Sequence, residues 1–339
     1  MNKILSVCIP TYNMEALLGR CLNSFIIEKE YMEMLEIIVV NDGSKDNSSK
    51  IAHEYAEKYP NAYIVIDKQN GNYGSCINAA MKVATGKYFK ICDADDRYET
   101  SNLKEFLAFL KKMDTDIVFS PFSTLTNRGA LKETVECFKS VKEKVYFIDD
   151  INWSDKKIME FRAMHCMAVK TEILRCNQYE QTEGISYTDT QFSFYSLLYS
   201  NTCSFFDKTI YLYYLGRDEQ TMSPISMKRT HYHFYLNADR LVDTYCNITT
   251  SLSMNKQIVL FNCIFIETLF FVEGFLGNFA NVDKQIALLK ALIEKSKKTN
   301  KFCPLEDSLL KSSRKYKLLT KYHFRPAVIF LLRFFQQLL

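Results

Sequence analysis

Three carboxylates stand close together in this 339-residue sequence and have the chemistry to bind a metal ion. Asp93, Asp95 and Asp96 directly follow residues 87–92, whose alternating, β-forming side chains predict a strand. Crowded carboxylates repel one another, and a hard divalent cation, Mg²⁺ or Mn²⁺, relieves that repulsion and can bridge to a substrate diphosphate. The alternative interpretation is a solvated acidic turn that caps the helix expected from about Ser101.

The elements that must position these acids form a repeating pattern. Predicted strands at residues 5–9, 36–40, 63–66 and 87–92 alternate with predicted helices at 15–27, 47–59 and 75–84. This alternation predicts a parallel sheet with helices on its faces. Right-handed crossovers would bring the polar loops at 11–13, 42–44 and 93–95 to one edge of the sheet, where they would form a nucleotide-sized site.

Two common phosphate-binding motifs are missing from the sequence. No Gly-x-Gly-x-x-Gly follows the first predicted strand, and no Gly-x-x-x-x-Gly-Lys-Ser/Thr occurs. Neither a dinucleotide-binding fold nor a P-loop is therefore supported, which leaves a metal ion to neutralise the phosphates. Nucleic acid is disfavoured as a partner because residues 1–220 hold 26 Lys and Arg against 31 Asp and Glu.

The overall composition is that of a compact protein in a reducing compartment. Hydrophobic residues make up 47% of the chain and aromatic residues 14%, which excludes a disordered chain. The eleven cysteines are scattered singly without a Cys-x-x-Cys pair, so we expect reduced thiols instead of disulfides or a zinc site. No signal-peptide pattern follows Met1, and we therefore expect a cytoplasmic location.

Four motifs occur in order over roughly residues 4–100. They are residues 7–13 (VCIPTYN), 38–46 (IVVNDGSKD), 72–74 (NYG) with Asn78, and 93–96 (DADD). Together they resemble the successive motifs of the family 2 inverting glycosyltransferases of GT-A fold. The resemblance implies an α/β fold, with a Rossmann-like, mostly parallel sheet flanked by helices. It also implies metal-dependent transfer of a sugar from a nucleotide-diphosphate sugar, with a UDP-sugar as the expected donor.

The resemblance assigns roles to residues that match the family's motifs. It implies that the donor is bound by Pro10, Thr11, Tyr12, Asp42, Asn72, Asn78 and Asp93, and that Asp95 coordinates Mn²⁺ or Mg²⁺. Within this set Asp42 would accept from the uracil imide and Asp93 would contact the ribose. Alternatives stay open from the residues alone, since Asn-Asp-Gly-Ser is a strong turn sequence and Asn78 suits helix packing.

A further acidic residue, Asp189, precedes a helix expected over residues 191–199. The segment 184–192 (GISYTDTQF) resembles the family's acceptor-side motif, which implies that Asp189 is the general base. The alternative is a residue that stabilises the helix N-terminus. His165 lies in the apolar segment 161–169, which we interpret as a strand; a single His there is more often a core residue than a ligand or base.

The segment 211–223 resembles the strand and loop that close over the donor in many family members. Arg217 and Gln220 would reach the diphosphate once this loop closes and excludes water. Gly216 precedes the loop and Pro224 follows it. The acids at 218 and 219 weaken a simple phosphate-clamp interpretation.

The expected domains are a GT-A domain at 1–225 and a helical extension at 226–339. Within the first, 1–100 is the nucleotide-sugar half and 101–225 the acceptor half. The extension shows helical patterns at 235–245, 256–276 and 284–297, without eighteen consecutive uncharged apolar residues, so we expect no spanning helix. From 295 to 339 there are 11 basic and 2 acidic residues, and residues 322–339 suggest a helix on an anionic membrane, at its inner face. Docking on the protein itself or on a second copy is the alternative.

The expected acceptor is a hydroxyl of a saccharide, such as a lipid-linked or cell-surface polysaccharide intermediate. A processive synthase of the same family is set aside because the Gln-x-x-Arg-Trp motif is missing and the single Trp, Trp153, lies in Asn-Trp-Ser. A catalytically degenerate sugar-nucleotide sensor or membrane scaffold is the non-enzymatic alternative, and the presence of both Asp95 and Asp189 counts against it. The motifs do not determine which sugar is transferred.

Overall fold

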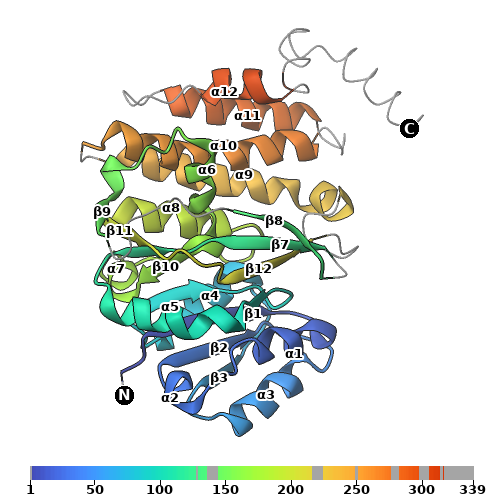
Figure 1. Ribbon diagram of the computed structural model, residues 1–339. Coiled ribbons are helices and arrows are strands. Elements are labelled where there is room, and N and C mark those ends of the chain that lie inside the picture. Colours follow the sequence, from blue (N-terminus) through green and yellow to red (C-terminus); the bar gives the residue numbers. More distant parts are fainter. Residues whose placement is uncertain are drawn as a thin grey trace. The chain divides into compact units, whose positions relative to one another are not determined.

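The computed structural model describes residues 2–126, 129–135, 144–215, 224–248, 251–275, 282–297, 305–313 and 316. The chain forms two compact units, Met1–Arg217 and Asp218–Leu339. The predicted division at 225/226 lies inside helix α9 (Pro224–Asn247). Among the described residues, strands occur only in the first unit (Figure 1).

The first unit contains an eight-stranded sheet in which β1 lies between β2 and β4. Its strands, in spatial order, are β3 (Tyr63–Asp67), β2 (Leu35–Asn41), β1 (Leu5–Thr11), β4 (Tyr88–Ile91), β10 (Met167–Lys170), β6 (Ile117–Phe119), β11 (Thr202–Phe205) and β9 (Tyr146–Phe147). Strands β1 to β4 are all parallel, as the sequence predicts. The order along the chain reverses at β1, and ligands bind outside the carboxyl ends of strands at such a point.

Helices cover both faces of this sheet because successive strand residues point to opposite sides (Figure 1). Ile9 of β1 belongs to the same buried cluster as Leu18 and Leu22 of α1. On the other face, Sγ of Cys8 lies 3.8 Å from the backbone oxygen of Cys76 in α4. The helices of this unit are α1 (Glu15–Asn23), α2 (Lys29–Met32), α3 (Ser48–Lys58), α4 (Asn72–Val83), α5 (Thr100–Lys112), α6 (Lys156–Met159), α7 (Thr171–Cys176) and α8 (Asp189–Tyr199).

The prediction of one strand over residues 161–169 is wrong. Two 3-10 turns, Glu160–Arg162 and Met164–Cys166, come first, and only then β10 begins. The backbone there forms hydrogen bonds within its own turns and needs no neighbouring strand; for example, the Cys166 N–H donates to the Ala163 oxygen at 3.0 Å. The buried Lys90 ammonium donates to the His165 oxygen at 2.5 Å and to the Met167 oxygen at 3.3 Å. His165 therefore sits in a turn beside the end of β4, and not in a strand.

A smaller sheet of four strands packs beside the acidic loop. Its order is β5 (Arg97–Tyr98), β12 (Tyr211–Leu215), β7 (Phe122–Thr126) and β8 (Leu131–Thr134). The fully buried Asp96 fixes β12, because its two carboxylate oxygens accept from the Tyr211 hydroxyl at 2.6 Å and from the Tyr214 N–H at 2.8 Å. The acidic loop after β4 and the strand β12 therefore hold each other in place.

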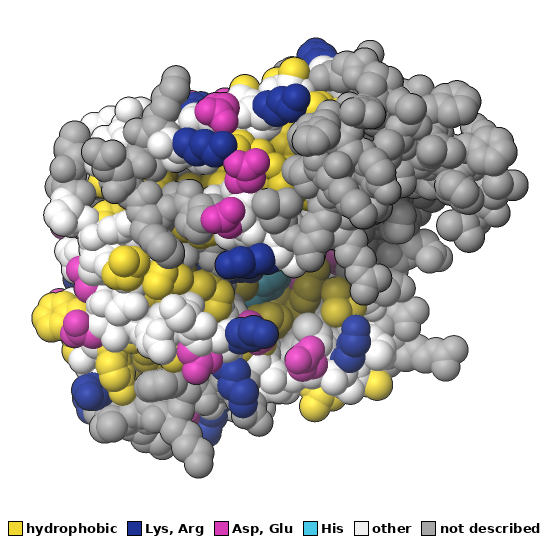
Figure 2. Space-filling view, turned by 90° about the horizontal axis from the view of Figure 1, so that it is seen from above, with side chains coloured by type: hydrophobic (Ala, Val, Ile, Leu, Met, Phe, Trp, Pro, Cys, Tyr) yellow, Lys and Arg dark blue, Asp and Glu magenta, His cyan; other side chains and the backbone are white. Residues whose placement is uncertain are grey.

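The second unit is helical in its described parts. Helices α9, α10 (Met254–Phe275) and α11 (Val282–Lys297) overlap the helical patterns in the sequence, and α12 (Leu305–Ser312) is a further helix that the sequence analysis did not predict. Lys295 of α11 forms ion pairs with Asp239 at 2.7 Å and Asp243 at 2.5 Å, both on α9. Figure 2 shows basic and acidic side chains interleaved on the face it presents, without a broad patch of one sign.

One helix of the second unit is long and apolar enough to cross a membrane by length and composition. It covers Met254–Gly274, with a mean hydropathy of 1.6, and half of this stretch is buried within the protein. The core helix of a soluble protein meets the same criteria, and the expectation of no spanning helix stays a prediction. The proposed membrane-binding tail, residues 322–339, lies outside the described residues.

Candidate active site

The buried carboxylate of Asp42, at the end of β2, is held by two donors. Its Oδ1 accepts from Lys68 Nζ at 2.7 Å and from the Gly71 N–H at 2.9 Å. Lys68 follows β3 and also donates to the Ser75 hydroxyl at 2.8 Å. A Cβ on Gly71 would approach Ser75 Oγ to 2.7 Å, so a larger residue would displace these donors. Asp42 is thus a fixed acceptor at the sheet edge, as a base-recognising residue must be.

The loop after β1 is joined to the loop after β2 by short hydrogen bonds. The Asp42 N–H donates to the Thr11 oxygen at 2.8 Å, and the Asn13 N–H donates to the Ser44 hydroxyl at 3.0 Å. Thr11 is buried, whereas the Tyr12 side chain is 46% exposed and available to a ligand. Pro10 is the second-last residue of β1. The predicted donor residues on these two loops therefore lie together.

Backbone strain concentrates in these loops. Four described residues other than glycine have a positive φ, and three of them, Asn13, Asn72 and Tyr187, lie in the motif segments. Asparagine tolerates this conformation, but for a tyrosine it costs free energy and persists only where the surroundings enforce it. Tyr187 immediately precedes the turn into α8, so the strain accompanies the placement of Asp189.

The acidic loop is fixed at Asp93 by two tyrosine hydroxyl groups. The Tyr73 hydroxyl of α4 donates to Asp93 Oδ1 at 2.8 Å, and the Asp93 N–H donates to the Tyr211 hydroxyl oxygen at 3.1 Å. Burial, and next the charge of Asp93, raise the pKa of Asp96 well above its ordinary value. A nearby cation would relieve this repulsion between the two acids.

His165 completes a group that fits such a cation. Ligand atoms of Asp93, Asp96 and His165 lie within 4.8 Å of one another. Nδ1 of His165 is buried and has no hydrogen-bond partner in the described structure. Burial, with a smaller effect of the Lys90 charge, lowers the pKa of His165 to about 3, so the imidazole is neutral and able to bind a metal. The orphaned nitrogen beside two carboxylates is a set of ligands that fits a divalent cation.

Asp95 and Asn78, two further residues of the predicted site, do not belong to that group of ligands. The Asp95 carboxylate is not one of the three ligands, although the residue belongs to the same loop and its backbone oxygen accepts from Arg20 Nη2 at 2.6 Å. Its role as a metal ligand stays a prediction. Asn78 uses its amide on the loop before α8, donating to the Gln181 oxygen at 3.0 Å and to Glu183 at 2.9 Å. A donor contact for Asn78 also stays a prediction.

Asp189 is the first residue of α8, and its cap residue is Thr188. The Thr188 hydroxyl donates to Gln181 Oε1 at 2.7 Å. Burial raises the pKa of Asp189, while the N–H groups of Asp189 and Thr190 and the charge of Arg162 oppose that rise. Burial, and next the charges of Asp93 and Asp189, raise the pKa of Tyr73.

The structure therefore gathers most, but not all, of the predicted site. The loops of Thr11, Asp42, Asp93 and Asp189 converge around α4. Asn72 starts α4 next to Gly71, and so lies at the same edge. Arg217 and Gln220 lie outside the described residues.

The sequence analysis missed the supporting roles of Lys68 and Tyr211. It named Asp96 only as one of three clustered acids, and it weighed His165 as a ligand but preferred a core residue. Lys68 directly follows β3, a position that signals a sheet-edge residue once the strand order is known.

Comparison with known proteins decides the family. The model of glycosyl transferase family 2 matches residues 6–176, slightly more than half of the 339 residues. The chain belongs to glycosyl transferase family 2. This confirms the family that the four motifs predicted, and the match extends well beyond them.

This family 2 chain has curated relatives that are much longer. It is 38% identical over 122 residues to the minor teichoic acid biosynthesis protein GgaB of Bacillus subtilis, covering 35% of this chain and 14% of that protein. It is 29% identical over 207 residues to the poly(ribitol-phosphate) beta-glucosyltransferase of Bacillus spizizenii, covering 57% of this chain and 32% of that protein. The chain thus spans less than a third of either relative.

Solved structures show the fold of the family 2 chain. The S. aureus TarS 1–349 complex with UDP-GlcNAc superimposes with a TM-score of 0.59 at 20% identity, covering 86% of this chain and 88% of that one. The mannosyltransferase PcManGT of Pyrobaculum calidifontis, in complex with GDP-Man and Mn²⁺, gives 0.52 at 14% identity over 95% and 84%. The predicted GT-A fold is confirmed.

Proposed function

We propose that the protein transfers a sugar, with inversion, from a nucleotide-diphosphate sugar to a hydroxyl group of an anionic cell-surface polymer or its lipid-linked precursor. The observation that carries this proposal is that α4 contacts both acidic segments: its Tyr73 hydroxyl donates to Asp93 Oδ1, and its Asn78 amide donates to the Gln181 oxygen in the segment before Asp189. The donor-side acid and the candidate base therefore belong to segments that α4 holds together, and we infer that the displacement at the anomeric carbon takes place between them. Names of relatives that act on poly(ribitol-phosphate) or teichoic acid support the choice of acceptor.

The donor half of the site follows from fixed acceptors and an exposed ring. Asp42, oriented by Lys68 and the Gly71 N–H, would accept from the imide of a uracil base, and Tyr12 would pack on that base. Asp93, oriented by Tyr73, would bind the ribose hydroxyls. A cation held by Asp93, Asp96 and His165, with Asp95 of the same loop as a further predicted ligand, would stabilise the charge of the leaving diphosphate.

The acceptor half centres on Asp189. Its carboxylate would accept the proton from the attacking hydroxyl, and its raised pKa makes it a stronger base than an exposed carboxylate. Arg162 lies near enough to lower that pKa, and so favours the ionised form needed for attack. Attack from the Asp189 side, opposite the leaving diphosphate, inverts the anomeric configuration.

A donor panel tests the proposal. Each UDP- and GDP-sugar is added with Mn²⁺, and the shift in melting temperature is measured, because the matching donor stabilises the folded state according to its concentration and Kd. The matched control is Asp42→Asn, which should lose stabilisation by UDP-sugars. The configuration of the product is then read by NMR. A panel in which no donor stabilises or is consumed would support a scaffold role and contradict the proposal.

A further inference from the structure

A second cluster of charge lies apart from the acids, around Arg97 of β5. Within the described part of the chain, the partly buried guanidinium of Arg97 forms no hydrogen bond or ion pair, and its Nε is shielded from solvent without a partner. Removing a charge from water without a compensating partner is costly. An arginine in this state therefore points to an anion that the described residues do not supply.

A second arginine, Arg20 of α1, lies beside it. Its Nε is also buried without a partner, although Nη2 is used by the Asp95 oxygen. Both guanidinium groups lie over the ring of Tyr214, with Cζ of Arg20 3.8 Å and Cζ of Arg97 5.6 Å from the ring centroid. Stacking on an aromatic ring holds the planar groups in place but leaves their N–H edges free for an anion.

Both arginines line a cavity of about 530 Å³, which we call the Arg20–Arg97 cavity. Its other lining residues are Asn23, Ser24, Tyr98, Glu99, Thr100 and Leu212. The carboxylate of Glu99 does not neutralise the arginines by direct contact, since it turns to α5 and accepts from the Ser101 hydroxyl at 2.7 Å. The volume lies within the range of ligand pockets and admits a phosphate with an attached polyol.

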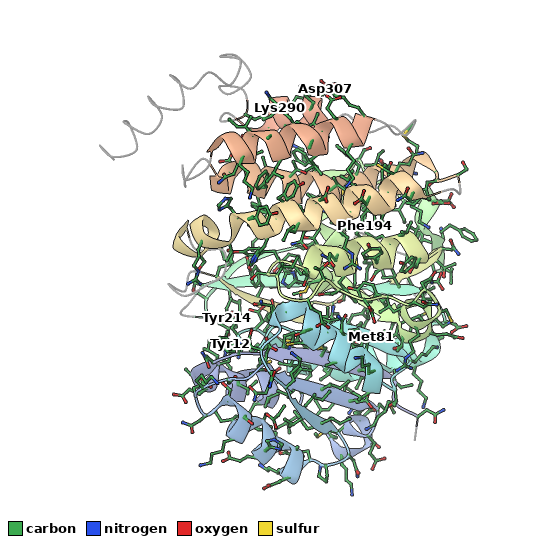
Figure 3. The ribbon with its side chains drawn as sticks, turned by 180° about the vertical axis from the view of Figure 1, so that it is seen from behind. Tyr12, Met81, Phe194, Tyr214, Lys290 and Asp307 are labelled. Carbon is green, nitrogen blue, oxygen red and sulfur yellow. The ribbon has the colours of Figure 1, made fainter. Side chains whose placement is uncertain are left out.

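The Arg20–Arg97 cavity is distinct from the donor site. Side chains alternate along β12, so that Tyr211 and Tyr213 pack on His165, with ring centroids 4.6 and 4.8 Å away. Leu212 and Tyr214 point to the opposite face, where Leu212 lines the cavity and the Tyr214 ring packs against Arg20. Figure 3 shows Tyr214 and Tyr12 at the same margin of the first unit. The hydrogen bond from Arg20 to the Asp95 oxygen connects the cavity to the acidic loop.

We propose that the Arg20–Arg97 cavity binds a phosphodiester group of the acceptor, a polyol-phosphate chain. The identity of the chain rests on the proposed function, whereas the need for an anion rests on the two arginines alone. Guanidinium groups bind phosphate through paired N–H donors. The hydroxyl groups of Ser24 and Thr100 donate to the backbone oxygens of Cys21 and Ser24, so the arginines are the donors on which the proposal depends. If one phosphate of the acceptor polymer binds in this cavity, a neighbouring repeat unit of the same polymer would lie at the edge of the sheet.

The binding experiment uses the full-length protein and inorganic phosphate. Melting temperatures are compared in sodium phosphate and in sodium chloride of the same ionic strength. We expect a phosphate-specific stabilisation that is lost in Arg97→Gln and retained in Lys111→Gln. The second substitution is the control because it removes an exposed charge at the other end of α5, away from the cavity. Arg97→Lys separates folding from binding, since it retains the charge but loses the paired donors. Equal phosphate responses in wild type, Arg97→Gln and Lys111→Gln would overturn the site.

The polymer experiment identifies the source of the phosphate. With poly(ribitol phosphate) as acceptor, Arg97→Gln should raise the KM for the polymer about tenfold, from the loss of charge-assisted hydrogen bonds, and leave the KM for the donor unchanged. Donor hydrolysis without acceptor is measured in parallel and tests the proposed function separately. If the polymer does not compete with inorganic phosphate for the cavity, the cavity binds a small anion. That result would overturn the assignment to an acceptor chain. Active transfer with an unchanged polymer KM would do the same.

Discussion

The Tyr73 hydroxyl lies 2.8 Å from Asp93 Oδ1 and 3.3 Å from the sulfur of Met164. It thereby connects three segments that are far apart in the chain: helix α4, the acidic loop and the turn that carries His165. Because the donated proton fixes one oxygen of Asp93, the other oxygen is presented in a defined direction. A donor ribose would meet a preorganised acceptor here, not a mobile carboxylate.

Tyr73→Phe tests this positioning role. The variant keeps the buried ring but removes the hydrogen bond to Asp93, so we expect the free energy of unfolding to fall by only about 1 kcal/mol. The KM for the donor should rise about tenfold, because a misdirected Asp93 loses its contact with the donor. Steady-state kinetics and urea unfolding provide the two measurements. A donor KM equal to that of wild type would show that Asp93 does not depend on Tyr73.

Lys68 is expected to govern nucleotide binding through Asp42. Lys68→Met removes the 2.7 Å contact with a buried carboxylate, which is then free to turn away from a base. We expect the Kd for UDP, measured by isothermal titration calorimetry, to rise about tenfold. Lys58→Met, at the last residue of α3, is the control for a general loss of positive charge. Similar Kd values for UDP in both variants would show that Lys68 has no specific role in nucleotide binding.

The parallel part of the fold and the gathering of its loops follow from short-range patterns. Strand-helix alternation places Asp42 and Asp93 at one edge without any knowledge of partners. The bond between Asp96 and Tyr211 joins residues 115 positions apart, and it depends on how β12 meets the acidic loop. No local pattern encodes that register. His165 was interpreted as part of a strand for the same reason, since its turn is held by the ammonium of Lys90 from a neighbouring strand.

Metal binding is expected to depend on His165. Since its neutral imidazole has an orphaned buried nitrogen next to Asp93 and Asp96, His165→Asn should weaken Mn²⁺ binding about tenfold or more, measured by EPR of free Mn²⁺ without donor. Nitrogen ligands favour Mn²⁺ over Mg²⁺, so the variant should also show a smaller preference for Mn²⁺ over Mg²⁺ than wild type does.

The matched control for this measurement is His53→Asn. His53 is an exposed histidine that also lies beside a carboxylate, with Nε2 2.7 Å from Asp67. Its loss should leave Mn²⁺ binding unchanged. Asp95→Asn, measured in the same series, decides whether the sequence-based assignment of that ligand holds. If Mn²⁺ binding survives His165→Asn but not Asp95→Asn, the histidine is a packing residue.

The catalytic assignment of Asp189 predicts both a rate and a pH profile. Asp189→Asn keeps the size of the side chain but cannot accept a proton, so kcat should fall by roughly 10²–10⁴ while the donor Kd changes by less than about threefold. A base acts only in its ionised form. Because burial raises the pKa of Asp189 above 3.8, kcat should fall as the pH drops through that raised value, by about tenfold per pH unit below it.

Arg162→Gln sharpens this last prediction. The charge of Arg162 lowers the pKa of Asp189, so its removal should move the acidic limb of the kcat profile to higher pH without abolishing activity at alkaline pH. An effect of helix stability alone would not move that limb. Should Asp189→Asn lower the melting temperature but retain kcat and the same acidic limb, Asp189 would be a stabilising residue at the start of α8, and the base would have to be sought elsewhere.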